Sequence, residues 1–280
     1  MKAFKKIKLK KDNINKIRRR IYTGFREKNF DLNLLKSSKR KYPDLRKNIN
    51  LCLWLENIFK PYIFRIFPKN YHNNLSLQFP MSIRVFYNKP KKYTSHNYST
   101  NILHSDIWSG APKNIRNFIY IVKISKNSSF CKIFNSIKKI KKYRNFKGKY
   151  VNSSLKEENL KEIKYNKENG VLLTFDPYCP HYTFFPKNCT DIRISLDFRV
   201  KTSSPYCENG KHISERKFIS EKIGQPGLGF YWSLSKKKFK NIKEKIQEEL
   251  MISKKLDKKA FELRTKYIKK VYKYYEMQRL

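Results

Sequence analysis

Cysteine pairs with a metal-binding or redox spacing are absent from this sequence. Its five cysteines, at positions 52, 131, 179, 189 and 207, are an odd number, and no C-x-x-C pair occurs. Neither a disulfide framework nor a structural zinc site is therefore predicted. Cys179 stands two residues before His181 and could be a soft metal ligand, although a small buried thiol is the more common state of such a residue.

Long hydrophobic runs are also missing. The most hydrophobic window, from Leu51 to Phe67, is interrupted by Glu56, Lys60 and Arg65, which excludes an ordinary membrane-spanning helix there. The first residues, MKAFKKIKLKK, are basic but lack the apolar stretch of a signal peptide. The default expectation is a cytoplasmic, reducing location.

Acidic residues are scarce. The 280 residues include 22 Asp or Glu against 65 Lys or Arg, which gives a formal net charge of +43 at pH 7. Such a charge would attract nucleic acid, anionic glycan or an acidic membrane surface. Lysine drift on a solvated surface explains it equally well, because Lys, Asn, Ile, Phe and Tyr are common here and all have AT-rich codons.

The composition still supports a packed interior, since 39% of residues are hydrophobic and 15% are aromatic. The pattern along the chain divides it into three parts. Residues 1–70 are predicted to be a basic helical N-terminal extension, with an apolar stripe that ends at Lys60-Pro61. Residues 71–235 are predicted to be a β core, and residues 236–280 return to basic amphipathic helices.

The core is recognised by short β-like runs that are separated by Asn, Pro, Ser, Gly and Lys. A lysine-rich stretch over 137–167 interrupts them and is interpreted as an insertion. Several short strands with turn residues between them favour a mainly β fold with flanking helices, either a barrel or a double-sheet jelly roll. The expected strands lie at 76–79, 83–87, 118–124, 171–175 and 192–200.

Five histidines occur, and only His104 has a carboxylate at a chelating spacing, in His104-Ser-Asp106. Residues i and i+2 of an extended strand project from the same face, so one imidazole and one carboxylate can bind the same cation. His181, which follows an apolar strand and turn, could complete two histidines and one carboxylate. That set leaves open positions, as an oxygen-activating iron(II) site requires.

Arg193 comes twelve residues after His181, in the strand at 192–200, which alternates strictly between apolar and polar residues. If its polar face lines a barrel interior, Arg193 needs an anionic partner, because an unpaired buried charge is very costly. A dicarboxylate co-substrate supplies one, and Ser195 on the same face can add a hydrogen bond. Arg199 is the alternative anchor, although Asp197 or a neighbouring acid is expected to balance it.

The combination of His104-x-Asp106, His181 and Arg193-x-Ser195 resembles the iron(II)/2-oxoglutarate dioxygenases of the phytanoyl-CoA dioxygenase superfamily, particularly bacterial members from carbohydrate and aminoglycoside-type biosynthetic clusters. The likeness is carried by HSDIWSGAP (104–112) and GVLLTFDPYCPHYTFFPKNCTDIRISLDFRV (170–200).

This resemblance implies a double-stranded β-helix (jelly roll) fold. It implies iron ligation by His104, Asp106 and His181, and a salt bridge from Arg193 to 2-oxoglutarate. The implied reaction couples decarboxylation of 2-oxoglutarate to succinate, with O2 as oxidant, to hydroxylation of a small or carbohydrate-type metabolite, for example a nucleotide sugar.

Two other functions fit parts of the pattern. The R-x5-R spacing of Arg193 and Arg199, with the charge of +43, also suits an oxidative demethylase of nucleic acid, although the step from His181 to Arg193 is short for that family. A non-catalytic jelly roll that binds anionic glycan or membrane is the third possibility. A complete ligand triad argues against it, because a protein without catalysis has no chemical need for all three ligands.

Other residues have weaker functional claims. Trp108 and Tyr178 could stack on a sugar ring, although packing at the rim of a barrel explains them as well. Gln78 and Arg84 could reach a ligand, but structural hydrogen bonding is the simpler interpretation. The remaining histidines, His72, His96 and His212, are expected at the surface, and the glycines at 224–229 indicate a turn, not a phosphate loop.

Overall fold

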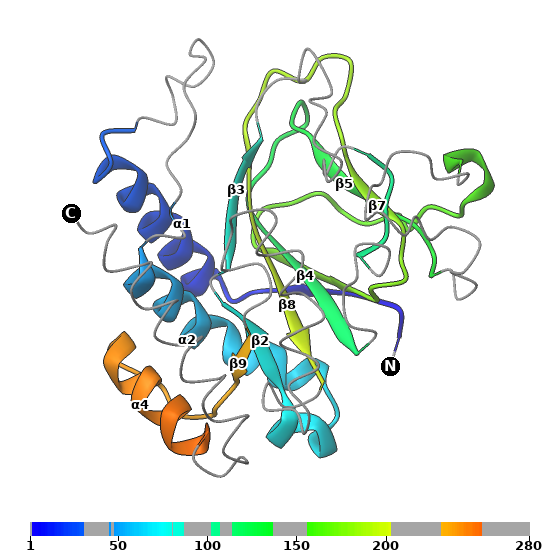
Figure 1. Cartoon of the computed structure of the whole chain (residues 1–280). Helices are drawn as coiled ribbons and strands as arrows, with labels where there is room; N and C mark the ends of the chain where they lie inside the picture. Colours follow the sequence, from blue (N-terminus) through cyan, green and yellow to red (C-terminus); the bar gives the residue numbers. More distant parts are fainter. Residues whose placement is uncertain are drawn as a thin grey trace. The chain divides into compact units, whose positions relative to one another are not determined.

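The structure is a computed structural model of the whole chain (Figure 1). The part that can be described comprises residues 2–30, 45, 48–79, 81–86, 102–106, 114–136, 156–202 and 231–253.

The chain divides into two compact units, and each is described by itself. The first unit consists of Met1–Pro43 and Ile83–Asp197, and the second of Asp44–Ser82 and Phe198–Leu280. Strand β8 (Arg193–Lys201) begins in the first unit and ends in the second.

The first unit contains a large and a small β-sheet (Figure 1). In the large sheet the strands follow the order β1 (Phe4–Lys8), β6 (Val171–Phe175), β4 (Ile115–Lys123) and β8, and β3 (Ser82–Phe86) also pairs with β8. The small sheet pairs β5 (Phe130–Ile133) with β7 (His181–Phe184). A short 3-10 helix, η6, spans Glu157–Asn159.

Two isolated bridges extend the small sheet on both edges. His104 pairs with His181 beside β7, and Phe134, just after β5, pairs with Glu162. The chain therefore visits the large sheet at β3, β4, β6 and β8, and the small sheet at His104, β5, Glu162 and β7. This order of visits, in which only β5 and Glu162 follow one another in the same sheet, is the strand order of a double-stranded β-helix, or jelly roll. The predicted fold class, mainly β with flanking helices, is confirmed.

The interior of this unit is apolar because its strands are rich in β-branched and aromatic residues. Alternate residues of β4 and β6 meet Cys131 and Ile133 of β5 in one buried cluster. Its members are Ile119, Ile121, Ile124, Cys131, Ile133, Val171, Leu173, Phe175 and Cys179.

Helix α1 (Lys11–Arg26) packs against β4 with one face, on which Ile17, Ile21 and Phe25 are fully buried. The chain reaches β6 through Gly170, whose φ of +80° suits glycine. A Cβ at this position would lie 2.2 Å from Cδ1 of Ile14 on α1, so the close approach of helix and turn also requires glycine.

The second unit contains the later half of β8, which pairs with β2, and β2 pairs in turn with β9. Helices α2 and α4 contact one another in the same unit. Its elements are α2 (Ile49–Ile66), the 3-10 helix η3 (Lys69–Asn74), β2 (Ser76–Gln78), β9 (Tyr231–Ser233) and α4 (Ile242–Ser253). Within the described ranges, every helix is too short or too polar to cross a bilayer.

The predicted strands agree with the structure, apart from small shifts at their ends, but two helix predictions are wrong. Phe4–Lys8, expected to be helical, forms β1 and pairs with β6, because a neighbouring strand supplies its hydrogen bonds. The apolar helical stripe within residues 1–70 was expected to end at Lys60-Pro61, yet the helix that carries it, α2, continues through Pro61 to Ile66. Burial of Ile63 and Ile66 beyond the proline offsets the lost hydrogen bond.

Helix α4 lies in the segment 236–280 that was predicted to be helical, and residues 254–280 of that segment lie outside the described part. The predicted boundaries of the three parts, after residues 70 and 235, stay predictions.

Candidate active site

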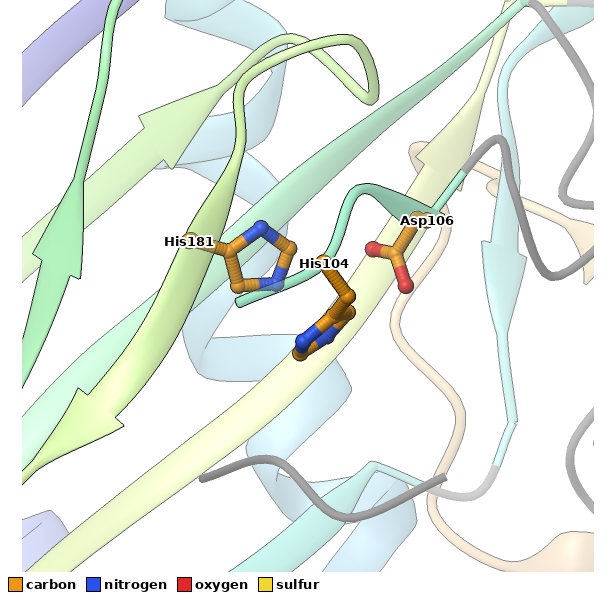
Figure 2. Close-up of side chains that lie close together, drawn as sticks. All are labelled: His104, Asp106 and His181. Carbon is orange, nitrogen blue, oxygen red and sulfur yellow. The ribbon is translucent and has the colours of Figure 1, made fainter. Parts of the chain in front are cut away.

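His104, Asp106 and His181 come together in the first unit, although His181 is distant in sequence from the other two (Figure 2). Each offers one ligand atom, and these atoms all lie within 4.8 Å of one another. His104 and His181 are joined through their backbones, because the N–H of each donates to the carbonyl of the other, at 3.1 and 2.8 Å. Asp106 follows on the same segment as His104. The three side chains therefore face a common space that is large enough for one cation.

The backbone also orients both imidazole rings. Nδ1–H of His104 donates to the carbonyl of Ile102 at 2.6 Å, and Nδ1–H of His181 donates to the carbonyl of Cys179 at 3.1 Å. A proton on Nδ1 leaves the lone pair on Nε2, which is the tautomer that a metal-binding histidine uses. Two histidines are thus prepared to coordinate through Nε2.

The surroundings of the three residues are tightly packed. His104 and Asp106 are only 3% and 2% exposed, and the ring of Phe175 lies edge-on to His181 with the centroids 4.9 Å apart. Ser105, between His104 and Asp106, donates to the carbonyl of Pro177 at 2.5 Å. The carboxylate of Asp106 adds a negatively charged oxygen to two imidazole nitrogens, a set of ligand atoms that suits a cation.

Arg193 is buried in the same unit, with 4% of its surface exposed. Its Nη2 lies 3.4 Å from the hydroxyl of Thr183, its guanidinium is 3.9 Å from the ring centre of Phe86, and its Nε has no hydrogen-bond partner. Burial lowers the pKa of this guanidinium, against the raising effects of Cys131 and Asp197. A buried cation with a vacant donor favours an anion as ligand.

Asp197, an acid whose charge acts on Arg193, is paired with another arginine. Asp197 lies 2.7 Å from Nε of Arg84 on the neighbouring strand β3. In the second unit, Nη1 of Arg199 donates to Oε1 of Gln78 at 3.3 Å. The expectation that Asp197 or a neighbouring acid balances Arg199 stays a prediction.

Ser195 lies on the same face of β8 as Arg193 and is fully buried. Its hydroxyl donates to Asp197 at 3.0 Å. The role of Ser195 in holding the co-substrate stays a prediction. In that role, its hydroxyl would have to rotate away from Asp197.

The other candidates of the sequence have structural partners or lie elsewhere. Cys179 is fully buried and contributes its backbone carbonyl, not its thiol, to the site. The backbone N–H of Tyr178 donates to Asp176, and the imidazole of His72 bonds to the carbonyl of Phe67. Trp108, His96, His212 and residues 224–229 lie outside the described residues.

Two polar residues of the interior were missed by the sequence analysis. Thr183 stands two residues after His181 on β7 and contacts Arg193. Asn117 lies on β4, in a run that is otherwise largely apolar, and it is 4% exposed. The predicted strand began at Phe118 and so excluded Asn117. Asn117, Ile119 and Ile121 alternate along the strand and so share one face. A polar residue on this otherwise apolar face was the signal that could have identified Asn117.

No family model matches the chain, and no curated protein matches it. Similarity is found to solved structures of non-haem enzymes. SnoN, an alpha-ketoglutarate-dependent epimerase from nogalamycin biosynthesis, is 10% identical, with 71% of this chain and 77% of that chain covered and a TM-score of 0.44. The carbocyclase SnoK from nogalamycin biosynthesis is 11% identical, with coverages of 76% and 86% and a TM-score of 0.47.

EctD from S. alaskensis, solved with 2-oxoglutarate and 5-hydroxyectoine, is 8% identical, with coverages of 71% and 72% and a TM-score of 0.41. At these low identities and TM-scores, only the strand order and the converging side chains of this chain itself bear on its function.

Proposed function

We propose that this protein is an iron(II)- and 2-oxoglutarate-dependent dioxygenase that hydroxylates a small or carbohydrate-type metabolite. The observation that carries the proposal is the convergence of His104, Asp106 and His181, with both imidazoles oriented to coordinate through Nε2. The resemblance in sequence to the phytanoyl-CoA dioxygenase superfamily supports it.

The donor set fits iron(II). Two imidazole nitrogens and one carboxylate oxygen on one side of a cation form a facial triad, which leaves positions on the opposite side for other ligands. His104, Asp106 and His181 would hold the metal, and the carbonyls of Ile102 and Cys179 would keep the two rings oriented.

The surroundings of Arg193 fit one carboxylate of 2-oxoglutarate. Arg84 and Arg193 together carry two positive charges, while Asp197 supplies one negative charge, so one carboxylate would balance this group. Nε of Arg193 has no partner and could donate to that carboxylate. Ser195 is the proposed second donor to it.

The distance between the two ends of the site also suits a short dicarboxylate. Thr183, which contacts Arg193, and the ligand His181 are two residues apart on β7. Two residues of a strand span about 7 Å. A five-carbon dicarboxylate can therefore reach the metal with one end and Arg193 with the other.

When bound, iron and 2-oxoglutarate would supply decarboxylation to succinate coupled to hydroxylation of the substrate by O2. The chain would hold the metal, anchor and orient the co-substrate and exclude water. Phe175 beside His181 and the apolar cluster of β4, β5 and β6 serve this last purpose.

The test uses purified protein with iron(II), ascorbate and 2-oxoglutarate. We expect slow formation of succinate without substrate and its loss in Asp106→Ala and His181→Ala. Glu168→Gln, which alters an exposed ion pair with Lys8, is the control and should retain the wild-type rate. Undiminished succinate formation by His181→Ala would refute the ligand assignment.

A further inference from the structure

The side chain of Asn117 is buried without any hydrogen-bond partner. It is 4% exposed, and neither Oδ1 nor Nδ2 contacts a donor or acceptor in the protein. A buried amide that lacks hydrogen bonds destabilises the folded state. Its neighbour Arg116, which is also buried, is by contrast well bonded: its Nε donates to Thr174 and its Nη2 to the carbonyl of Lys2.

The strand register places Asn117 on the interior face of the large sheet. It lies directly opposite Phe175 of β6, so the two side chains project from the same face at a short distance. The alternate residues Ile119 and Ile121 of β4 lie in the buried cluster together with Phe175. Asn117 therefore points into the jelly roll.

This position is next to the candidate metal site. Phe175 contacts the ring of His181, with the two ring centroids 4.9 Å apart. The amide of Asn117 is thus separated from a proposed metal ligand by one aromatic side chain. A molecule bound in the interior beside His181 would be within reach of it.

The chemistry of the amide limits what it can bind. Nδ2 donates and Oδ1 accepts, and both are without partners. A carboxylate only accepts, so it would satisfy Nδ2 and leave Oδ1 unpaired. An alcohol hydroxyl both accepts and donates, and it could satisfy both atoms.

We propose that Asn117 binds a hydroxyl group of the substrate, so that the substrate is a polyol or sugar-like molecule. The proposal rests on the proposed function, because it places this substrate beside the metal ligands. A site that hydrogen-bonds a substrate hydroxyl strongly rejects an analogue that lacks this hydroxyl. An apolar pocket discriminates much more weakly between ligands that differ only in size. Asn117 is therefore a residue that determines specificity.

The first test measures thermal stability without ligands. Asn117→Leu replaces the amide by an apolar side chain of nearly the same shape, and we expect its Tm to rise by several degrees, because two unpaired polar atoms are removed. The matched control is Thr174→Val on the opposing strand, which removes a hydroxyl that accepts from Arg116 and should lower the Tm. A lower Tm in Asn117→Leu would show that the amide has a structural role and would overturn the proposal.

The second test measures binding to zinc-substituted protein with 2-oxoglutarate, which cannot turn over. The probes are methyl hexosides, hexitols and inositols, each paired with its deoxy analogue. Ligand-observed NMR measures the binding of each probe. We expect at least one hydroxylated probe to bind at least about tenfold more tightly than its analogue, and Asn117→Leu to lose this preference. No bound probe, or a preference that persists in Asn117→Leu, would overturn the proposal.

The affinity for 2-oxoglutarate separates this inference from the proposed function. If both are correct, Asn117→Leu binds metal and 2-oxoglutarate as the wild type does. A tenfold or greater loss of 2-oxoglutarate affinity in this variant would mean that the amide contacts the co-substrate, which would overturn the inference and leave the proposed function intact. Failure of wild-type protein to bind 2-oxoglutarate would contradict the proposed function itself.

Discussion

His104 and His181 hold one another in place through two backbone hydrogen bonds, at 2.8 and 3.1 Å, across 77 residues of sequence. The two imidazoles, whose ring centroids lie 4.4 Å apart, are therefore brought together by the sheet itself and do not need a cation to approach. The metal site should be preformed in the folded protein, so that binding costs little reorganisation.

A preformed site predicts that divalent metal raises the stability of the wild type. A ligand that binds only the folded state at a concentration of 100 times its Kd adds about 2.7 kcal/mol. We expect manganese(II) or iron(II) under anaerobic conditions to raise the Tm of the wild type and not that of Asp106→Ala. Differential scanning fluorimetry measures both. An equal increase in Asp106→Ala would place the binding of the metal elsewhere.

We predict that Arg193 strengthens the binding of 2-oxoglutarate but does not stabilise the ligand-free protein. Arg193→Met removes a buried cation with a vacant donor, so the ligand-free protein should be as stable as the wild type or more stable. Its affinity for 2-oxoglutarate should fall by about 2–5 kcal/mol. Calorimetric titration and chemical denaturation measure the two effects.

Arg199→Met is the matched variant for Arg193→Met. Arg199 donates to Gln78, and we expect this substitution to leave the affinity for 2-oxoglutarate nearly unchanged. The reverse result, a large loss in Arg199→Met and none in Arg193→Met, would make Arg199 the anchor.

The sequence predicted β6 and β8, which carry Phe175 and Arg193, because their apolar residues cluster or alternate over short runs. It did not predict β7, which carries His181, or the bridge at His104. It also predicted that His104, Asp106, His181 and Arg193 belong together, from a resemblance of order and spacing. The spacing of His104 and Asp106 is local, and the strand period alone decides that both can point the same way.

The remaining features depend on contacts that are distant in sequence. Nothing local indicates that Lys5 and its neighbours form a strand, because that conformation exists only through pairing with β6. The ion pair of Asp197 with Arg84 depends on β3 lying beside β8. The role of Asn117 depends on its register with Phe175. Such pairings follow from topology, not from periodicity.

A buried ion cluster in the second unit should be sensitive to the loss of one charge. Glu56 lies 3.2 Å from Nζ of Lys60 and 3.5 Å from Nζ of Lys245, and it accepts from Nε1 of Trp232 at 3.0 Å. Burial lowers the pKa of Lys60, and Glu56 opposes that effect. Glu56→Gln keeps the shape but removes the carboxylate that the two buried ammonium groups share, while Glu249 stays 3.6 Å from Nζ of Lys245.

We expect Glu56→Gln to lower the free energy of unfolding by about 3–5 kcal/mol, the usual range for breaking a buried pair. Urea denaturation measures it. The exposed pair of Lys8 and Glu168 is the comparison, and Glu168→Gln should have no measurable effect. If the two substitutions were equally mild, the cluster in the second unit would contribute little to stability.

The turn before β6 provides a test of backbone strain. Gly170→Ala places a Cβ at a φ of +80° and within 2.2 Å of Cδ1 of Ile14, and it should destabilise the protein by about 1–3 kcal/mol through the backbone alone. Adding Ile14→Ala relieves only the clash. The double variant should therefore recover no more than part of the loss, and full recovery would show that the backbone of Gly170 is not strained.

Cys131 predicts a loss of stability at alkaline pH. Burial raises the pKa of this thiol from its ordinary 9.0 to about 12, against the lowering effect of Arg193. In the unfolded chain the thiol loses its proton above pH 9, while in the folded protein it keeps the proton, so the unfolded state binds fewer protons in this range. The contribution of Cys131 to stability is therefore complete below pH 9 and declines by about 1.4 kcal/mol per pH unit as the pH rises toward 12. Chemical denaturation of the wild type and Cys131→Ala at several pH values between 8 and 11 should give converging stabilities as the pH rises, because the variant lacks this group. A constant difference between the two proteins would mean that the thiol titrates alike in both states.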